Sequence, residues 1–296
     1  MGFKFIDLFA GIGGFHIAFD NLGGECVFAS EWDENCRKTY TANFKSTNPN
    51  LFENENFVGD ITKINPLAIP DHDILCAGFP CQPFSQAGQK KGFEDTRGTL
   101  FFNVANIAKT KKPKVIFLEN VRGLFTHDNG KTFDVIKNTI LGLGYSFYFQ
   151  ILKASDFNCP QNRPRLYMVC FRNDIDSVDF KFPSPVPLEK NMSWVFDGAS
   201  VNKEIGFTLR VGGKNSPIND RRNWDGYIVN GEERRITPRE GKRMQGFPEE
   251  FVFPVSNSEA MKQLGNSVAI PVIQAIGENI LAIICNQKEE KNEKEI

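Results

Sequence analysis

Four groups of polar or reactive residues each follow an apolar run in the first 120 residues. A glycine-rich turn, Gly11 to Gly14, follows the run Phe3–Phe9, and the pair Glu31–Trp32 follows a second run. The loop around Pro80–Cys81 follows a third run, and Glu119 ends a fourth. Because open parallel sheets bind ligands at the carboxyl ends of their strands, these positions predict one composite ligand site.

The first two groups suit a ligand that contains a nucleoside. Glycines let a ligand approach the backbone closely, although His16 stands where the dinucleotide fingerprint G-x-G-x-x-G has its third glycine. Glu31 lies 17 positions after Gly14, near where ribose-binding carboxylates usually fall. Trp32 offers a flat face for an adenine ring, and Asp60 could accept from an exocyclic amine. A tight structural turn beside a core tryptophan is the alternative.

The sequence environment of Cys81 differs from that of the other cysteines. Cys26, Cys76 and Cys170 lie in apolar runs and fit inert core thiols. Cys81 lies in a polar loop between prolines, where a rigid scaffold could present a thiolate nucleophile. Glu119 is either a solvated strand terminus or a carboxyl shielded from water, which could keep its proton and act as a general acid.

Basic residues gather later in the chain. Arg163 and Arg165 alternate before an apolar run, so both side chains should face the same way. They could bind a phosphate or a carbonyl, and solvated surface charge is the alternative. The stretch 203–243 has ten basic and six acidic residues, although the whole chain has a net charge of −1. Contacts to phosphates and base edges, or a solvated charged surface, would both explain this excess.

The overall composition excludes several classes of protein. The chain has 296 residues, of which 41% are hydrophobic and 24% charged, so it can bury a core and is not disordered. The sequence contains no run of 18 apolar residues, so no membrane span is predicted, and the first residues do not resemble a signal peptide. The seven cysteines show no C-x-x-C spacing and the three histidines are far apart, so neither a disulfide scaffold nor a metal site is expected.

Strands and helices alternate over the first 171 residues, which predicts an α/β fold with a mainly parallel sheet and helices on both faces. The expected strands are Phe3–Phe9, Cys26–Ala29, Asp73–Ala77, Val115–Leu118, Ser146–Leu152 and Leu166–Phe171. The expected helices run from the glycine turn to about Leu22, over Asp33–Phe44 and over Gly98–Lys109. From about residue 181 the chain is proline-rich and then irregular, until a short helix through Met244 and a helix over Val268–Cys285.

Taken together and in order, these motifs resemble the cytosine-5 DNA methyltransferases, in particular the compact bacterial enzymes of restriction–modification systems. The motifs are DLFAGIGGF (7–15), EW (31–32), GDI (59–61), GFPCQPFS (78–85), ENV (119–121), QNRPR (161–165), RRITPREGKRMQGFP (234–248) and QLGNSV (263–268). The resemblance implies a Rossmann-like, S-adenosylmethionine-dependent methyltransferase fold with a small irregular target-recognition lobe.

The resemblance also implies a division of the chain. A catalytic and cofactor-binding domain would span residues 1–180 and be completed by the helix 268–285. The target-recognition lobe and the return to the catalytic domain would span 181–262, and 286–296 would be a charged, frayed tail.

The implied activity is transfer of a methyl group from S-adenosylmethionine to carbon 5 of a flipped cytosine through a covalent cysteine adduct, with S-adenosylhomocysteine as the second product. The implied catalytic residues are Cys81, Glu119, Arg163 and Arg165. The implied cofactor-binding residues are Phe9, Gly11, Gly13, Gly14, Glu31, Trp32, Asp60, Ile61, Pro80, Asn266, Ser267 and Val268. The implied DNA-binding residues are Ser85, Gln86, Thr208, Leu209, Arg210, Arg221 and Arg222.

Double-stranded DNA and a cognate restriction endonuclease acting on the same site are the expected partners of a monomeric, cytoplasmic, nucleoid-associated enzyme without metal or membrane. Three alternatives are weighed against this interpretation. A tRNA cytosine-5 methyltransferase shares the catalytic motifs, but the Cys-Phe-Thr signature of that branch is absent. An inactive DNA-binding module would be expected to lack Cys81 or Glu119, and His16 disfavours an NAD-dependent oxidoreductase.

Overall fold

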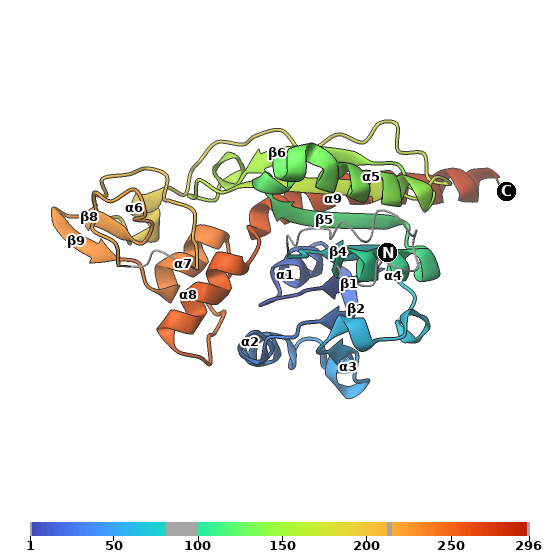
Figure 1. Ribbon diagram of the computed structural model, residues 1–296, viewed down its shortest axis with the longest axis horizontal. Helices are drawn as coiled ribbons and strands as arrows, with labels where there is room; N and C mark the ends of the chain where they lie inside the picture. Colours follow the sequence, from blue (N-terminus) through green and yellow to red (C-terminus); the bar gives the residue numbers. More distant parts are fainter. Residues whose placement is uncertain (1, 81–99, 212–214, 295–296) are drawn as a thin grey trace.

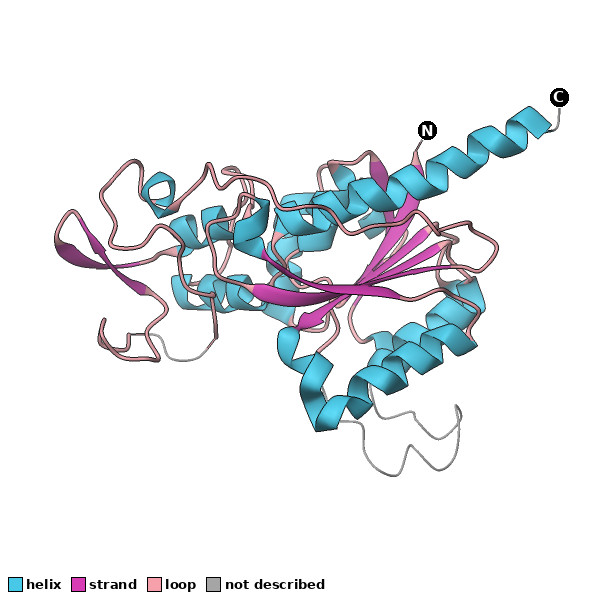
Figure 2. Ribbon diagram, turned by 90° about the horizontal axis from the view of Figure 1, so that it is seen from above, coloured by secondary structure: helices cyan, strands magenta, loops and turns pink. Residues whose placement is uncertain are grey.

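A seven-stranded sheet with helices on both faces forms the body of the protein (Figures 1 and 2). The computed structural model describes residues 2–80, 100–211 and 215–294, with side chains up to Cys285. The strands are β1 (Phe3–Leu8), β2 (Gly24–Ser30), β3 (Phe57–Val58), β4 (Ile74–Ala77), β5 (Val115–Val121), β6 (Tyr148–Lys153), β7 (Pro164–Phe171), β8 (Gly226–Val229) and β9 (Glu232–Arg235). The α-helices are α1 (Gly14–Asp20), α2 (Glu34–Phe44), α3 (Pro49–Glu53), α4 (Leu100–Lys111), α5 (Lys131–Gly142), α6 (Met192–Val195), α7 (Pro238–Gln245), α8 (Asn257–Asn266) and α9 (Ile270–Lys294). Short 3₁₀ segments are η1 (Ile61–Lys63), η2 (Pro66–Ala68), η4 (Arg122–Gly130) and η5 (Ala154–Phe157).

The sheet order is β3-β2-β1-β4-β5-β7-β6, and neighbouring strands from β3 to β5 are parallel. Only β7 runs against its neighbours β5 and β6 within this sheet. The predicted α/β fold with a mainly parallel sheet is therefore confirmed. This order places the carboxyl ends of β1, β2, β4 and β5 along one edge of the sheet. The four groups of polar or reactive residues identified from the sequence lie at this edge.

Side chains of β1 alternate between two cores because successive residues of a strand face opposite sides. Phe3 and Phe5 join a core that contains α1 and α9, whereas Ile6 and Leu8 join a second core that contains α4 and α5. One charged residue, Asp7, lies fully buried on the α1 side, and burial raises the pKa of its carboxyl well above the usual value.

Several elements extend beyond their predicted limits. β5 continues to Val121, so Glu119 is a paired strand residue opposite Tyr167 and not a strand terminus. β7 begins at Pro164, which places Arg165 inside the strand. Helix α8 was not predicted from the sequence, because its buried face includes Gln263 and Gly265, which interrupt the apolar helical period.

The last helix, α9, also differs from the prediction, since it continues to Lys294 through most of the segment expected to fray (Figure 2). Glu, Lys and Gln are strong helix formers, which explains the extension. Helical residues Asn257–Cys285 are long and apolar enough to cross a membrane by length and composition, but half of an apolar 18-residue window within them is buried inside the protein. Packing of α9 on α1 accounts for that burial.

The region after β7 forms a smaller lobe at one end of the molecule (Figure 1). The hairpin of β8 and β9 lies beside α6, and α7 and α8 lie between this hairpin and the main sheet. Long irregular segments connect these elements, as the sequence predicted. Trp224 and Tyr227 are buried in this lobe, and they belong to the same apolar cluster as α1 and α9, so the lobe and the main body share one core.

The glycine turn between β1 and α1 combines left-handed backbone with close packing. Gly11 and Gly13 have φ angles of +57° and +87°, which residues other than glycine rarely adopt. A Cβ at Gly13 would lie 2.3 Å from the ring of Phe44, and one at Gly14 would lie 2.6 Å from Val268. A Cβ at Gly11 would meet no atom within 4 Å, so Gly11 alone leaves open space above the turn.

We expect Gly13→Ala to lower the free energy of unfolding by about 2 kcal/mol or more, because it adds a steric clash to left-handed strain. Gly11→Ala is the matched control and should cost only about 1 kcal/mol, since it adds strain without a clash. Urea unfolding of the ligand-free proteins, followed by circular dichroism, measures both. Equal losses would contradict the packing role of Gly13.

Candidate active site

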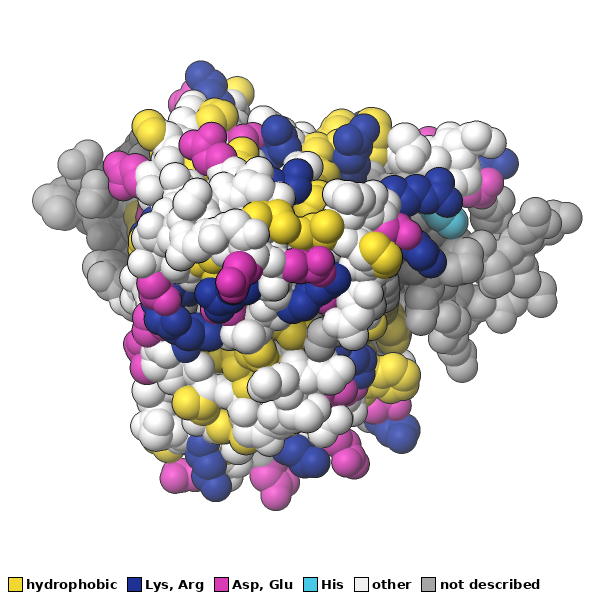
Figure 3. Space-filling model, turned by 90° about the vertical axis from the view of Figure 1, so that its left-hand side faces the viewer, with side chains coloured by type: hydrophobic (Ala, Val, Ile, Leu, Met, Phe, Trp, Pro, Cys, Tyr) yellow, Lys and Arg dark blue, Asp and Glu magenta, His cyan; other side chains and the backbone are white. Residues whose placement is uncertain are grey.

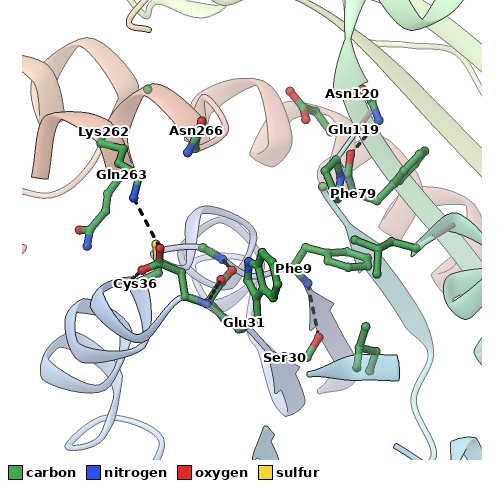
Figure 4. A pocket seen from close by; sticks show the side chains of 18 of the residues that line it. Phe9, Ser30, Glu31, Cys36, Phe79, Glu119, Asn120, Lys262, Gln263 and Asn266 are labelled. Atoms are coloured by element: carbon green, nitrogen blue, oxygen red, sulfur yellow. Dashed lines mark hydrogen bonds and ion pairs between the residues drawn. The ribbon is translucent and has the colours of Figure 1, made fainter. Parts of the chain in front are cut away.

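A cavity of about 710 Å³ lies at the carboxyl edge of the sheet. It is lined by Phe9, Gly11, Ser30, Glu31, Trp32, Asp33, Cys36, Gly59, Asp60, Ile61, Thr62, Gly78, Phe79, Pro80, Leu100, Glu119, Asn120, Val121, Arg163, Arg165, Glu259, Lys262, Gln263, Gly265 and Asn266. Figure 4 shows that Glu119 and Asn120 lie on one side, Phe9 and Glu31 in the middle, and Lys262 with Gln263 on the other side. The strand ends predicted to meet do meet here.

The carboxylate of Glu31 holds the glycine turn in place. Its Oε2 accepts from the backbone N–H of Gly11 and its Oε1 from that of Asp33, both at 2.8 Å. Burial raises the pKa of Glu31, while these two N–H groups act in the opposite direction. A carboxylate oxygen has further lone pairs, so Glu31 could also accept from ligand hydroxyls.

Two aromatic residues face the same part of the cavity. Trp32 is 82% exposed, which is unusual for a large aromatic side chain and leaves its ring face open to a ligand. Phe9 has a φ angle of +57°, a strained conformation for a residue with a bulky side chain, and its N–H points to Ser30 Oγ at 3.4 Å. Such strain is typical of residues held in place for binding.

Asp60 lies on the rim of this wall. Its Oδ1 caps η1 by accepting from the N–H and the hydroxyl of Thr62, at 3.0 and 2.7 Å. Its Oδ2 lies 3.6 Å from Lys63 Nζ. The hydrogen bonds from Thr62 hold the pKa of Asp60 below its usual value, so the group is available as an anionic acceptor.

Glu119 and Arg165 form a buried ion pair on the opposite side of the cavity. Arg165 Nε lies 3.1 Å from Glu119 Oε1. Burial raises the pKa of Glu119, and the charges of Arg165 and Arg163 only partly offset this effect. A carboxyl with a raised pKa can carry a proton closer to neutral pH, as a general acid requires.

The backbone next to Glu119 is fixed by Asn120. Its Nδ2 donates to the carbonyl of Phe79 at 2.8 Å, and its Oδ1 accepts from the N–H of Val121. Pro80 also lines the cavity, directly before Cys81 in the chain. Cys81 itself, with Ser85 and Gln86, lies outside the described residues, so their roles stay predictions.

Arg163 lines the cavity as expected, and its predicted contact with a substrate base stays a prediction, but the side chain also binds the protein backbone. Its two terminal nitrogens donate to backbone carbonyls of Leu209, Gly265 and Ser267. Burial lowers its pKa to about 9, and the nearby charge of Arg165 acts in the same direction. The side chain therefore joins distant segments of the protein through its terminal nitrogens, whereas its Nε has no hydrogen-bond partner among the described residues.

Four residues expected to touch a cofactor do not line the cavity. Gly13 and Gly14 pack against Phe44 and Val268, so they shape the turn and leave Gly11 to face the open space. Ser267 and Val268 are buried behind Asn266, which does line the cavity.

Among the expected DNA-binding residues of the smaller lobe, some are buried or bonded within the protein and others are exposed. Leu209 is buried, and the hydroxyl of Thr208 donates to the carbonyl of Asn162. Arg222 pairs with Asp220 at 2.9 Å, whereas Arg221 is exposed and Arg210 is exposed with one nitrogen on the carbonyl of Arg222. Figure 3 shows this end of the molecule, where Lys and Arg side chains lie beside Asp and Glu side chains. Internal pairing thus neutralises part of the basic excess.

Some cavity residues were not singled out from the sequence. Phe79 and Asn120 lie inside the motifs GFPCQPFS and ENV, so their position beside Cys81 and Glu119 was the signal that could have identified them. Lys262 pairs with Asp33 at 3.6 Å across the cavity, and the buried Gln263 accepts from the Thr39 hydroxyl at 2.9 Å. Those two contacts join α8 to α2 and no local pattern predicts them. Within the described residues, no cluster of His, Cys, Asp and Glu could hold a metal ion.

Comparisons with known proteins agree with this architecture. Residues 3–206 and 199–282 match the family of C-5 cytosine-specific DNA methylases. Type II methyltransferase M.HhaI from Haemophilus parahaemolyticus is 43% identical over 317 residues, covering 94% of this chain and 94% of that protein. Type II methyltransferase M.SsoII from Shigella sonnei is 43% identical over 315 residues, covering 95% of this chain and 81% of that protein.

Solved structures share the fold at lower identity. The crystal structure of S. pombe Dnmt2 methyltransferase matches with a TM-score of 0.69 and 21% identity, covering 95% of this chain and 98% of that one. The fold is thus that of a Rossmann-like, S-adenosylmethionine-dependent methyltransferase. The chain belongs to the C-5 cytosine-specific DNA methylases, and it is an enzyme that methylates carbon 5 of cytosine in DNA.

We expect Trp32→Ala to weaken S-adenosylhomocysteine binding about fivefold or more, because a lost aromatic stack costs about 1 kcal/mol. Trp194→Ala is the matched control, since Trp194 is partly exposed on α6 and does not line the cavity. Isothermal titration calorimetry without DNA measures both affinities. Unchanged affinity in Trp32→Ala would remove this residue from the cofactor site.

Proposed function

We propose that the enzyme acts on one cytosine of a short duplex sequence after this base has left the helix and entered the cavity. The observation that carries the proposal is the buried pair of Glu119 and Arg165 in the same cavity as Trp32. Stacked neighbours cover both faces of a cytosine ring, through which its 5,6 double bond must react, so an enzyme must extrude the base.

The wall around Glu31 and Trp32 is proposed to hold S-adenosylmethionine. Trp32 would stack on the adenine, Glu31 would accept from the ribose hydroxyls and Asp60 from the adenine amine. The bound cofactor supplies a methyl group on a positively charged sulfur. Further contacts are proposed for Phe9, Gly11, Ile61, Pro80 and Asn266.

The opposite wall is proposed to hold the cytosine. A protonated Glu119 would donate to ring nitrogen 3, and Arg165 would donate to the ring carbonyl oxygen. The carbonyl of Phe79, oriented by Asn120, would accept from the exocyclic amine. Protonation at nitrogen 3 draws electrons from carbon 6 and prepares it for nucleophilic attack.

Cys81 is proposed as the nucleophile, because its neighbour Pro80 already lines the cavity. Its thiolate forms a bond to carbon 6, and the electron pair of the 5,6 double bond moves to carbon 5. Carbon 5 then bonds to the methyl carbon as the bond from that carbon to sulfur breaks, which leaves S-adenosylhomocysteine. A base removes the carbon 5 proton, the double bond re-forms and the thiolate leaves.

The smaller lobe is proposed to read the DNA sequence. Arg210 and Arg221 are exposed there and could reach phosphates or base edges. Arg222 would have to exchange its ion pair with Asp220 for a phosphate. Thr208 and Leu209 are proposed to support the reading surface from inside.

The biological setting is inferred from the relatives. M.HhaI and M.SsoII carry the name Type II methyltransferase. From this similarity, we propose that the enzyme protects host DNA from a cognate restriction endonuclease. We further propose that it is a cytoplasmic, nucleoid-associated monomer. Methylation of tRNA is the less supported alternative, and a tRNA arm in the methyl-transfer assay separates the two.

We expect DNA from a bacterial host that expresses the protein, and otherwise lacks cytosine methylation, to show 5-methylcytosine at one short sequence. Bisulfite sequencing measures this, and Cys81→Ser should abolish it because a hydroxyl is a far weaker nucleophile at neutral pH. Cys76→Ala and Cys170→Ala are matched controls in the core and should retain the mark if they fold.

The covalent step has its own readout. A duplex with 5-fluorocytosine at the mapped site cannot release the carbon 5 substituent, so wild-type enzyme with S-adenosylmethionine should form an adduct that survives a denaturing gel. Peptide mass spectrometry should place it on Cys81. An adduct on another residue, or none with active enzyme, would refute Cys81 as nucleophile.

We expect Glu119→Gln to lower kcat by about a hundredfold or more, the usual contribution of a positioned proton donor. Because burial raises the pKa of Glu119 and the protonated form is the active one, wild-type turnover should fall as pH rises through that pKa. The variant should lack this fall, which a pH–rate profile would show. Glu25→Gln, an exposed change on β2, is the control.

A further inference from the structure

Arg163 connects three backbone carbonyls that belong to two distant segments. Its Nη1 lies 3.2 Å from the carbonyl oxygen of Leu209, and its Nη2 lies 3.1 Å from that of Gly265 and 2.5 Å from that of Ser267. The side chain is only 2% exposed, so water cannot replace these contacts. Two or more charge-assisted hydrogen bonds from a planar group fix both segments in orientation as well as distance.

The two segments serve the two substrates. Gly265 and Asn266 line the cavity opposite Glu31, so they form part of the wall proposed for the cofactor. Leu209 precedes the exposed Arg210 of the smaller lobe, and its N–H donates to Gln161 Oε1 at 3.0 Å. Arg163 therefore lies where the cofactor wall and the DNA-reading lobe meet the sheet.

A second side chain holds the same turn from the other side. Gln245, at the end of α7, donates from Nε2 to the carbonyls of Leu264 at 2.8 Å and Ser267 at 3.4 Å. Gln245 is completely buried, as is Gln161, whose Nε2 donates to the carbonyl of Met244. The turn after α8 is thus held between the lead-in to β7 and a helix of the smaller lobe.

Packing alone would not require such an arrangement. A buried guanidinium costs free energy unless its donors are satisfied, and all three of its hydrogen-bond partners here are neutral carbonyls. A methionine of similar length would fill the same space without that cost. The charged fork provides directional links between segments, which an apolar side chain cannot provide.

We propose that Arg163 is a positioning residue, which couples the smaller lobe to the S-adenosylmethionine site by holding Leu209 and the Gly265–Ser267 turn on β7. This inference rests on the proposed cofactor wall. It predicts that DNA engagement by the lobe and cofactor binding strengthen each other, since both require the same placement of these segments.

The competing assignment is contact between Arg163 and the flipped cytosine. Its Nε has no hydrogen-bond partner among the described residues, so the N–H of this nitrogen remains for such a contact. The two assignments differ in one measurement, the affinity for the cofactor product when no DNA is present. A base contact leaves that affinity unchanged, whereas a positioning role lowers it.

The test is calorimetric titration of S-adenosylhomocysteine into Arg163→Met without DNA. We expect the Kd to rise about tenfold, the usual effect of losing a charge-assisted hydrogen bond. The KM for S-adenosylmethionine should rise by a similar factor and kcat should fall less. Tyr145→Phe is the matched control, because it removes a buried hydrogen bond to Pro113 before β5, at the other end of the sheet, and should leave the Kd unchanged.

Two further variants keep the proposal testable if Arg163→Met fails to fold. Arg163→Lys keeps the charge without the fork and should give an intermediate Kd. Gln245→Leu leaves Arg163 intact, loosens the same turn from α7 and should also raise the Kd. The proposal is overturned if the folded variants at both positions bind S-adenosylhomocysteine as the wild type does.

The coupling is measured by repeating the titration with a duplex that contains the bisulfite-mapped site. In the wild type, the duplex should tighten S-adenosylhomocysteine binding, and in Arg163→Lys this gain should shrink. A wild type whose affinity does not respond to the duplex would refute the coupling. Failure of the proposed cofactor wall would show separately, as unchanged binding in Trp32→Ala.

Discussion

The contact between the Glu31 carboxylate and the backbone N–H of Gly11 is the interaction on which the cavity depends. The N–H of Gly11 lies 2.8 Å from Glu31 Oε2, which holds a turn with two left-handed glycines at the end of β2. The other carboxylate oxygen accepts from the N–H of Asp33 and so holds the start of α2. The turn leaves open space above Gly11, which lines the same cavity as Phe9 and Trp32. Without this contact, one oxygen of the buried carboxylate would lose its backbone donor, and this link between the glycine turn and the end of β2 would be lost.

A second constraint is the burial of charge on the opposite wall. Glu119, Arg165 and Arg163 are all largely removed from water, so each must find its partner inside the protein. Glu119 and Arg165 pair with each other and both face the cavity, which leaves a carboxyl with a raised pKa next to a cation. Arg163 instead donates from its terminal nitrogens to carbonyls from the lobe and from the turn after α8. In the short motif QNRPR, Arg165 thus faces the cavity within β7, whereas Arg163 before β7 holds segments of the protein together.

The fold was predictable where local patterns match the tertiary environment. The runs around β1, β2, β4 and β7 are apolar because both faces of the sheet are covered, so their existence and order could be read directly. Limits were less predictable: β5 extends through Glu119 and Asn120 because Tyr167 and Leu166 of β7 pair with these polar residues. Helix α8 was missed because its polar residues, including Lys262, contact α2 and not solvent alone.

The sequence by itself determined which chemistry the protein carries, because the reactive residue types recur in a fixed order at strand ends. Glu31, Trp32, Asp60, Glu119 and Arg165 were identified in this way, and all line the cavity. The tertiary structure alone decided that Gly13 and Gly14 serve packing and that Arg163 holds Leu209 and Ser267. The reason is physical: these roles depend on backbone groups and side chains far away in the chain, and spacing along a sequence carries no information about which distant carbonyl will meet a buried donor.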